Sequence, residues 1–464
     1  MRTWNHSAAR TSLAMTMGLL LTACPFTDDY FIDSNAAHSG GTGGVASQGT
    51  GGASAGKSSV VICTPSNCAG TCCNDECVDI ASDPTNCGTC STQCSGGQAC
   101  VLRRCSSGWS AMAPAPDSLL ARERPAYVAM GDRLFIFGGV DDAGTPFNNG
   151  AIYDPARNRW TLLPIDANTP SPRRLSTAVW TGTLVVVFGG RESDASAGFA
   201  EAAAYNPILN QWVALPNDTN ARSGALGVTN DRYSAFWGGW GLNFALLSGA
   251  ERLDLQTSSW APATSAPGAD PGVLDSPAWA FTGQYLYLYG GRVNSTTKTN
   301  QGRVYDLVAN SWSNLTSPTT GPTARWGAFG VWDGASFYVW AGKDESVARS
   351  DGAAFNGSTW TTMSATGAPT VRWAPARQTG WSFARAVGDL LFIGGQDASG
   401  KCLTNGGRYI ANGGVTAGNW TAIPNWTSGE DHLWGASVHV GGTVLVWGGR
   451  NGNAVTATGD RWAP

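Results

Sequence analysis

Short apolar runs bounded by polar turns recur along the chain from about residue 130 to its end. Runs such as Leu134–Phe137 are too short for a helix and are rich in the residues that favour buried strands. Seven of these runs end in two small residues, and the first members of successive pairs lie 49 to 54 residues apart. The pairs are Gly138-Gly139, Gly189-Gly190, Gly238-Gly239, Gly290-Gly291, Ala341-Gly342, Gly394-Gly395 and Gly448-Gly449. A period near fifty predicts one β-rich unit that is repeated seven times.

Each unit continues from its pair through a polar loop to a second apolar segment and then, in all but the last unit, to a Trp. In the first unit the second apolar segment contains Tyr153, and the Trp is Trp160, seven residues later. Tyr205 and Trp212 of the second unit are separated by the same seven residues. We expect the pair to end a buried strand where the chain turns close to another backbone, because a Cβ there would obstruct the approach. The unit therefore predicts several strands joined by tight turns.

The pair, the Tyr and the Trp recur in order and in phase, and this pattern resembles the kelch motif over roughly residues 106–464. The resemblance implies an all-β fold, a seven-bladed kelch-type β-propeller with four-stranded blades. Within the recurring Trp series, Trp109 precedes the first pair, whereas the chain stops at Trp462-Ala463-Pro464, before the final strand of the last unit. We therefore expect Trp109–Met112 to pair into the seventh blade and close the ring, which removes exposed sheet edges.

The N-terminal residues predict export. Two Arg residues precede an apolar stretch, residues 13–23, that is too short to span a bilayer and is typical of a secretory signal. The segment from Leu21 to Cys24 resembles the lipobox of bacterial lipoproteins, which implies a signal peptide over residues 1–23 and diacylation of Cys24. An ordinary signal with an incidental Cys is the alternative. Residues 24–62 are rich in Gly and Ser, so we expect a flexible linker there.

Ten of the twelve cysteines lie in residues 63–105, where the small core and the predicted export favour a disulfide-rich module before the propeller. They are Cys63, Cys68, Cys72, Cys73, Cys77, Cys87, Cys90, Cys94, Cys100 and Cys105. A zinc site is the alternative, although only Cys87 and Cys90 have the two-residue spacing. The run from Asp83 to Cys90 resembles a cysteine-rich repeat that accompanies adhesive or sensory domains in bacterial surface proteins.

In kelch propellers the loops after the pairs and before the innermost strands surround the central channel. By that resemblance, basic and aromatic residues in these loops form a candidate ligand site: Arg174, Arg191, Arg222, Trp240, Arg292, Arg325, Trp326, Arg377, Trp434 and Arg450. Indoles stack on sugar faces and Arg binds carboxylates bidentately. The alternative is that these Arg residues belong to the scaffold and pair with loop carboxylates such as Asp141 and Asp142.

Charge and composition narrow the expected partners. The formal net charge is −4 and 13% of residues are charged, so nothing indicates a nucleic-acid partner. We expect a lipoprotein on the bacterial cell envelope, in the outer membrane or on the cell surface, anchored to the membrane through its N-terminal lipid. Its expected role is non-catalytic binding of a glycan or a surface protein, with no cofactor, no metal and no catalytic residues.

Two enzyme alternatives stay open. The basic loop residues suit an epimerase or lyase that acts on acidic sugars, although no carboxylate or His pair can be assigned to it. Galactose oxidase also carries a kelch-like propeller and holds copper through two His and two Tyr. Here only His432 and His439 lie in the predicted propeller, and no matching Tyr–His pair is visible. A copper enzyme is therefore the weaker alternative.

Overall fold

The structure is a computed structural model. It describes residues 108–463, except for 266–267, 295–296, 316–320, 345–346, 375–379 and 412–413. Before residue 108 it describes residues 63, 68, 70–74, 76–80, 83, 85–94, 99–101 and 103–106. The predicted signal, the lipidation site Cys24, the linker and Arg377 lie outside the described residues.

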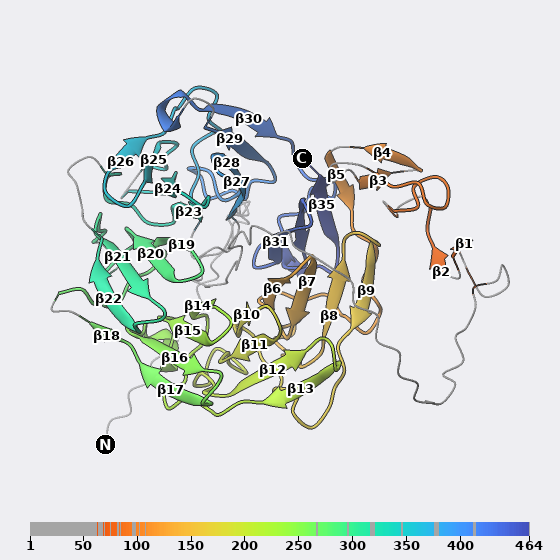
Figure 1. The fold of residues 1–464 in the computed structure, drawn as a ribbon, viewed down its shortest axis with the longest axis horizontal. Coiled ribbons are helices and arrows are strands. Elements are labelled where there is room, and N and C mark those ends of the chain that lie inside the picture. Colours follow the sequence, from red (N-terminus) through yellow and green to blue (C-terminus); the bar gives the residue numbers. More distant parts are fainter. Residues whose placement is uncertain are drawn as a thin grey trace, which may run out of the picture.

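Seven sheets, each antiparallel in its four blade strands, form a propeller, and their innermost strands surround the central axis (Figure 1). The first three are β6 (Ala126–Met130), β7 (Arg133–Phe137), β8 (Gly150–Asp154) and β9 (Arg159–Leu162); β10 (Thr177–Trp180), β11 (Val185–Phe188), β12 (Ala202–Asn206) and β13 (Gln211–Ala214); and β14 (Leu226–Thr229), β15 (Tyr233–Trp237), β16 (Ala250–Asp254) and β17 (Ser259–Pro262). The next three are β19 (Ala278–Phe281), β20 (Tyr285–Tyr289), β21 (Gly302–Asp306) and β22 (Ser311–Asn314); β23 (Phe329–Trp332), β24 (Phe337–Trp340), β25 (Gly352–Phe355) and β26 (Trp360–Thr362); and β27 (Gly380–Ala386), β28 (Asp389–Gly394), β29 (Gly406–Ile410) and β30 (Asn419–Ile423).

Two short additions flank this regular pattern. Strand β18 (Thr264–Ser265) pairs in parallel with the outer strand β22, and the hairpin β33–β34 (Arg450–Asn451 and Ala454–Val455) follows the last small-residue pair. Helical structure appears as single 3-10 turns, η1 (Leu242–Phe244) and η3 (Val415–Ala417). Among the described residues, no helix has the length and apolar character needed to cross a membrane.

The seventh blade is completed by the N-terminal strand, as the sequence predicts. It contains β31 (Ala436–Val440), β32 (Thr443–Trp447) and β35 (Gly459–Ala463), and its outer strand is β5 (Gly108–Ala111). Strand β5 runs antiparallel to β35, with Trp109 opposite Trp462. The count of seven blades and the closure of the ring are both confirmed.

In most blades the repeated Trp ties the outer strand to the segment that enters the blade. In five blades the indole nitrogen donates a hydrogen bond to a main-chain carbonyl of that segment: Trp160 to Ala113 (3.0 Å), Trp212 to Pro164 (3.1 Å), Trp260 to Pro216 (2.7 Å), Trp420 to Ser364 (2.8 Å) and Trp109 to Pro424 (2.8 Å). Because Trp109 makes the same contact as the others, β5 occupies the regular outer position of a blade.

The blades pack face to face through apolar side chains. One cluster between the first two blades joins Phe135 and Phe137 of β7 to Val185 and Val187 of β11, with Trp212 beside them. The ring of Trp212 lies 4.9 Å from that of Phe137, centroid to centroid. Burial of such clusters between successive blades is the main apolar contribution to stability.

The cysteine-rich region contains two short hairpins, β1–β2 (Thr71–Cys73 and Glu76–Val78) and β3–β4 (Ala99–Val101 and Arg104–Ser106). Its ten cysteines form five disulfides: Cys63–Cys72, Cys68–Cys77, Cys73–Cys90, Cys87–Cys100 and Cys94–Cys105. The disulfide prediction is confirmed, and sulfurs committed to disulfides are not thiolates that could hold zinc. The region also contacts the first blade, because Arg159 forms an ion pair with Glu76 (2.5 Å).

Two truncations test how much the closure contributes to stability. A chain that starts at residue 114 lacks β5, so we expect its melting temperature to fall by about 10 °C or more relative to a chain that starts at residue 106. Both chains lack the disulfide region, so the comparison isolates residues 106–113, that is β5, the two residues before it and the two residues that connect it to the first blade. Equal melting temperatures in a thermal scan would show that the ring is stable without this pairing.

Candidate functional site

The small-residue pairs bring the main chains of neighbouring blades into close contact at one end of the propeller. A Cβ on Gly138 would lie 2.5 Å from the carbonyl oxygen of Arg173, and φ is +70° at Gly138. This confirms the predicted reason for the pair. The second member of the pair donates its N–H to the next blade: Gly139 to Arg173 O (2.9 Å), Gly190 to Arg222 O (3.0 Å), Gly291 to Arg325 O (2.8 Å), Gly342 to Arg372 O (3.0 Å) and Gly449 to Arg122 O (2.8 Å).

The residues that accept these bonds reach back with their side chains to the first member of the pair in their own blade. The guanidinium donations are Arg122 to Gly138 O (2.8 Å), Arg173 to Gly189 O (2.8 Å), Arg222 to Gly238 O (3.1 Å), Arg325 to Ala341 O (3.0 Å) and Arg372 to Gly394 O (3.0 Å). In the seventh blade the ring nitrogen Nδ1 of His432 lies 2.8 Å from Gly448 O. We call these six residues the staple residues. In the fourth blade Leu274 stands at the corresponding position, sixteen residues before Gly290.

The staple arginines are buried, and their charges are compensated to different degrees. Arg325 pairs with Asp351 (2.8 Å) and Arg173 pairs with Glu201, whereas Arg122 and Arg372 bind main-chain carbonyls. Burial lowers the pKa of Arg122 to about 9 and that of Arg372 to about 10. Both values remain above neutrality, so these guanidinium groups stay charged and act as fixed hydrogen-bond donors.

The residue after each staple pairs through its main chain with the residue after the glycine pair, and together these residues form a rim around the axis. The rim pairs are Glu123 with Val140, Arg174 with Arg191, Ser223 with Trp240, Asp275 with Arg292, Trp326 with Lys343, Trp373 with Gln396, and Leu433 with Arg450. The rim therefore contains six of the ten predicted ligand residues and gathers them from five blades.

On one side of the rim, ion pairs join the second, first and seventh blades. Arg174 binds Asp194 (2.5 Å), and Arg124 lies 3.8 Å from the same carboxylate and 3.5 Å from Glu123. Arg450 then binds Glu123 (2.6 Å). The chain of charges ends at Asp142, which lies 3.1 Å from Arg450. These contacts tie the first and last blades together across the closure.

The opposite side of the rim alternates cations with indoles. The Arg292 guanidinium lies 3.7 Å from the ring centroid of Trp326 and forms an ion pair with Asp275. Trp326 contacts Trp373 edge to face at 4.6 Å, and the Lys343 Nζ lies 4.9 Å from the Trp373 ring. Among the described residues, Lys343 has no carboxylate partner within 4.0 Å, which sets it apart from Arg292.

The structure places the predicted ligand residues mostly in internal contacts. Arg222 and Arg325 are staple residues, and Arg191 is buried against Ser223 Oγ (2.8 Å) and Gly241 O (2.8 Å). The three indoles of the set are buried, with exposed fractions of 3% for Trp240, 5% for Trp326 and 4% for Trp434. The scaffold alternative holds for Asp142, which pairs with Arg450, while Asp141 caps its own loop through the N–H groups of Ala143 and Thr145.

Four staple residues, Arg122, Arg173, Arg372 and His432, are missing from the sequence-based set. Four of the five arginine staples precede the first member of their pair by sixteen residues, and Arg372 precedes it by twenty-two. That constant interval was the available signal. The interval is hard to recognise in the sequence, because some residues that follow the staples are also basic. Arg174, for example, directly follows the staple residue Arg173.

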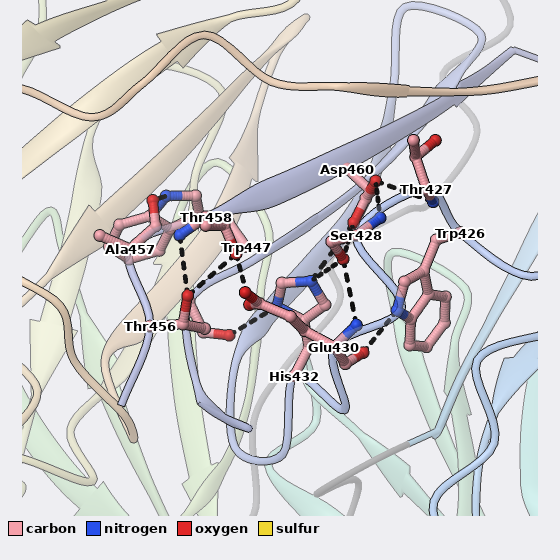
Figure 2. Close-up of polar contacts among 11 residues, drawn as sticks. Trp426, Thr427, Ser428, Glu430, His432, Trp447, Thr456, Ala457, Thr458 and Asp460 are labelled. Carbon is pink, nitrogen blue, oxygen red and sulfur yellow. Dashed lines mark hydrogen bonds and ion pairs between the residues drawn. The ribbon is translucent and has the colours of Figure 1, made fainter. Parts of the chain in front are cut away.

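The seventh staple also belongs to a buried polar cluster (Figure 2). His432 and Asp460 are both 0% exposed, and His432 Nε2 lies 3.4 Å from Asp460 Oδ2. Ser428 Oγ donates to the same Asp460 oxygen (2.5 Å) and lies 3.3 Å from His432 Nε2. Sequence reasoning missed this His–carboxylate pair because the two residues stand 28 positions apart on separate elements.

This cluster does not have the geometry of a nucleophile–base–acid triad. In such a triad the carboxylate binds one ring nitrogen and the serine binds the other. Here Asp460 and Ser428 both face Nε2, while Nδ1 is held by the Gly448 carbonyl. Both ring nitrogens are thereby engaged, so His432 is not placed to ligate copper either. Burial lowers the pKa of the other propeller histidine, His439, to about 4.

A substitution of Arg325 separates a scaffold role from a ligand role. Arg325→Leu reproduces the residue type found at Leu274, but it leaves the Ala341 carbonyl and Asp351 without their partner. Asp351 is half exposed and can be solvated, so the main loss is at the buried carbonyl, and we expect the free energy of unfolding to fall by about 1–3 kcal/mol in chemical denaturation. Arg232→Gln is the control, because the Arg232–Asp254 pair is at the surface and should contribute little. Unchanged stability of Arg325→Leu would contradict the scaffold role.

Comparison with known proteins agrees with this repeat architecture. The KLHDC2/KLHL20/DRC7 Kelch-repeats domain matches residues 88–272, and the stigma-specific STIG1-like protein family matches residues 54–111. Alpha-scruin of Limulus polyphemus is 26% identical over 30% of this chain and 16% of its own length. Kelch-like protein terF of Aspergillus terreus is 27% identical over 44% of this chain and 46% of its own length.

Human kelch-like protein 38 is 26% identical over 43% of this chain and 34% of its own length. The chain thus spans less than half the length of these curated relatives. A solved structure titled "Structure of YjhT" is 18% identical, with a TM-score of 0.47 over 68% of this chain and 99% of that one. From the repeat geometry and the matches to kelch proteins, we conclude that this chain carries a kelch-repeat domain folded as a seven-bladed β-propeller.

Proposed function

We propose that the chain is a non-catalytic binding module that captures an acidic partner protein at the rim end of its propeller. The observation that carries this proposal is Lys343, a half-buried rim cation without a carboxylate partner among the described residues. Most of its basic neighbours on the rim are already neutralised by carboxylates of the same chain. A partner that brings a carboxylate to Lys343 supplies a missing interaction rather than displacing one.

Exposed aliphatic side chains in the loops that follow the pairs favour a protein partner over a glycan. Val347 lies in the loop that starts at Lys343 and is 55% exposed, and Val293 follows Arg292 and is 41% exposed. Leu242, in the equivalent loop of the third blade, is 57% exposed. Aliphatic groups of this kind gain from burial against apolar side chains. The indoles that would stack on a sugar are buried, so they offer a glycan little surface.

A binding role without turnover agrees with the chemistry of the described residues. The His432–Asp460 pair has the residue types needed for acid–base chemistry, but both side chains are fully buried and engaged with each other and with the main chain. A general base has to reach the proton that it removes. We therefore retain the epimerase or lyase alternative only as an outcome of the experiment.

The proposed setting is the bacterial cell envelope. It rests on the apolar N-terminal stretch and the lipobox-like segment that ends at Cys24, and five disulfides are the usual state of an exported region. In this proposal the Gly/Ser-rich linker separates the lipid anchor from the propeller, which leaves the rim free to meet partner proteins.

The proposal is tested by selecting displayed random peptides on the full chain and by probing a glycan array with the same protein. We expect enriched peptides to combine Asp or Glu with aliphatic residues. Lys343→Gln should weaken their binding about tenfold, as expected for the loss of one charge-assisted contact. Lys401→Gln removes a similar charge from an exposed loop of the sixth blade and should leave affinity unchanged.

Three outcomes would contradict the proposal. Glycan binding that depends on Lys343 would replace the protein partner with an acidic glycan. Consumption of a sialic or uronic acid, followed by mass spectrometry, would replace binding with catalysis. Peptides that bind Lys343→Gln as tightly as the unchanged protein would show that the rim cation is not the contact.

A further inference from the structure

The end of the propeller that lies opposite the rim carries partly exposed aromatic side chains. Tyr285 and Tyr287 lie on β20, whose other end runs into the pair Gly290-Gly291. Trp332 is the last residue of β23, in the neighbouring fifth blade (Figure 1). Tyr285 is 39% exposed, more than any other aromatic ring among the described side chains, and Tyr287 and Trp332 are half-buried. We call these three residues the aromatic platform.

Packing fixes the rings of the platform in place. The ring of Tyr287 is nearly parallel to that of Trp332, with 7° between their planes and 5.8 Å between their centroids. Tyr287 also stacks on Phe337 at 5.6 Å, and Phe337 is a buried residue that stands opposite Trp332 in the sheet. Side chains two residues apart in a strand point to the same face, so Tyr285 lies on the same side of β20 as Tyr287. The rings are thus ordered before any ligand binds.

The polar tips of the platform are available for hydrogen bonding. Within the described part of the chain, neither the Tyr287 hydroxyl nor the Trp332 indole N–H is bonded to another residue, and neither atom is buried. The Tyr285 hydroxyl is likewise unbonded there and belongs to an exposed side chain. Burial and the neighbouring Tyr285 raise the pKa of Tyr287, so its hydroxyl keeps its proton at neutral pH. Two hydroxyls and one N–H therefore accompany the apolar ring surface.

The platform lacks the charges that accompany the rim indoles. Those indoles lie beside Arg292 and Lys343, whereas no cation lies over a platform ring in the part of the chain that the structure describes. The acidic side chains at this end of the two blades are Asp306 and Asp333. Each accepts two main-chain N–H groups of its own turn, at 2.8 to 2.9 Å. The surface that remains combines aromatic rings with neutral hydrogen-bonding groups.

We propose that Tyr285, Tyr287 and Trp332 form a binding site for a neutral glycan. The C–H face of a pyranose ring covers apolar surface in the way that another ring would, while its hydroxyls exchange hydrogen bonds with phenol and indole groups. An acidic sugar would gain less here, because the platform offers its carboxylate no cation. The site is independent of the proposed rim surface, since it lies at the other end of the propeller.

Trp180 provides an internal comparison. It is the last residue of β10, the position that Trp332 occupies in β23, and its indole is also half-buried. No aromatic ring is stacked on it among the residues that the structure describes, in contrast to the Trp332–Tyr287 pair. A single indole offers a sugar less surface than three adjoining rings, so Trp180 is a matched control for Trp332.

The test is the binding of neutral oligosaccharides to the full chain. An array of glucose, mannose, xylose and N-acetylglucosamine oligomers identifies the strongest one, and titration calorimetry measures its affinity. We expect Trp332→Ala to weaken binding about tenfold or more, because the stacking surface is lost. Tyr285→Phe keeps the ring and removes one hydroxyl, so it should weaken binding about three- to tenfold. Because Tyr285 is exposed, this variant covers the case in which Trp332→Ala fails to fold.

Two control variants separate the platform from other surfaces. Trp180→Ala should leave the affinity unchanged, and so should Lys343→Gln, which removes the rim cation. A chain that binds none of the neutral oligosaccharides would overturn the proposal, as would full affinity in both Trp332→Ala and Tyr285→Phe. A loss of affinity in Lys343→Gln would place the glycan at the rim and would also contradict it.

Discussion

The structure depends on the close approach of neighbouring main chains at the small-residue pairs. At Gly138, Gly189 and Gly290 a carbonyl of the next blade comes within a distance that a Cβ would block. In five of the seven pairs the N–H of the second member binds that carbonyl. The buried staple side chain then satisfies the carbonyl of the first member, which lies out of reach of water. A buried carbonyl without a donor costs about 1–3 kcal/mol. Repetition of this arrangement around the ring, with a staple residue in six of the seven blades, makes the ring a cooperative unit rather than seven separate sheets.

This constraint also decides which residues are available for function. Arg222 and Arg325 are committed to holding the ring, and Arg174 and Arg450 neutralise carboxylates across the closure. The proposed partner surface is therefore the part of the rim that the scaffold does not use, namely Lys343 and the exposed aliphatic residues of the loops that follow the pairs. The scaffold thus explains why a ring rich in arginine and tryptophan need not be a carbohydrate site.

The repeat made the fold predictable, because spacing and order survive when individual residues change. Blade number, ring closure by Trp109 and the disulfide state of ten cysteines all followed from counts along the chain. Site residues were harder to predict, since a basic side chain in a loop looks the same whether it binds a carbonyl, a carboxylate or a ligand. Arg173 and Arg174 are neighbours in sequence, yet one is a buried staple and the other pairs with Asp194. The His432–Asp460 pair could not be predicted from residue spacing, because its two members lie on separate elements, 28 positions apart in the sequence.

The most direct test of this account is the stability of Gly290→Ala in chemical denaturation. At Gly290 φ is +71° and an added Cβ would lie 2.5 Å from the carbonyl oxygen of Arg325. Ala341, which occupies the same position in the next blade with φ +64°, shows that the residue type alone is tolerated when the surroundings allow it. The account predicts that Gly290→Ala loses about 3 kcal/mol or more of unfolding free energy, whereas Ala341→Gly loses little. Unchanged stability of Gly290→Ala would contradict the claim that close main-chain approach at the pairs holds the propeller together.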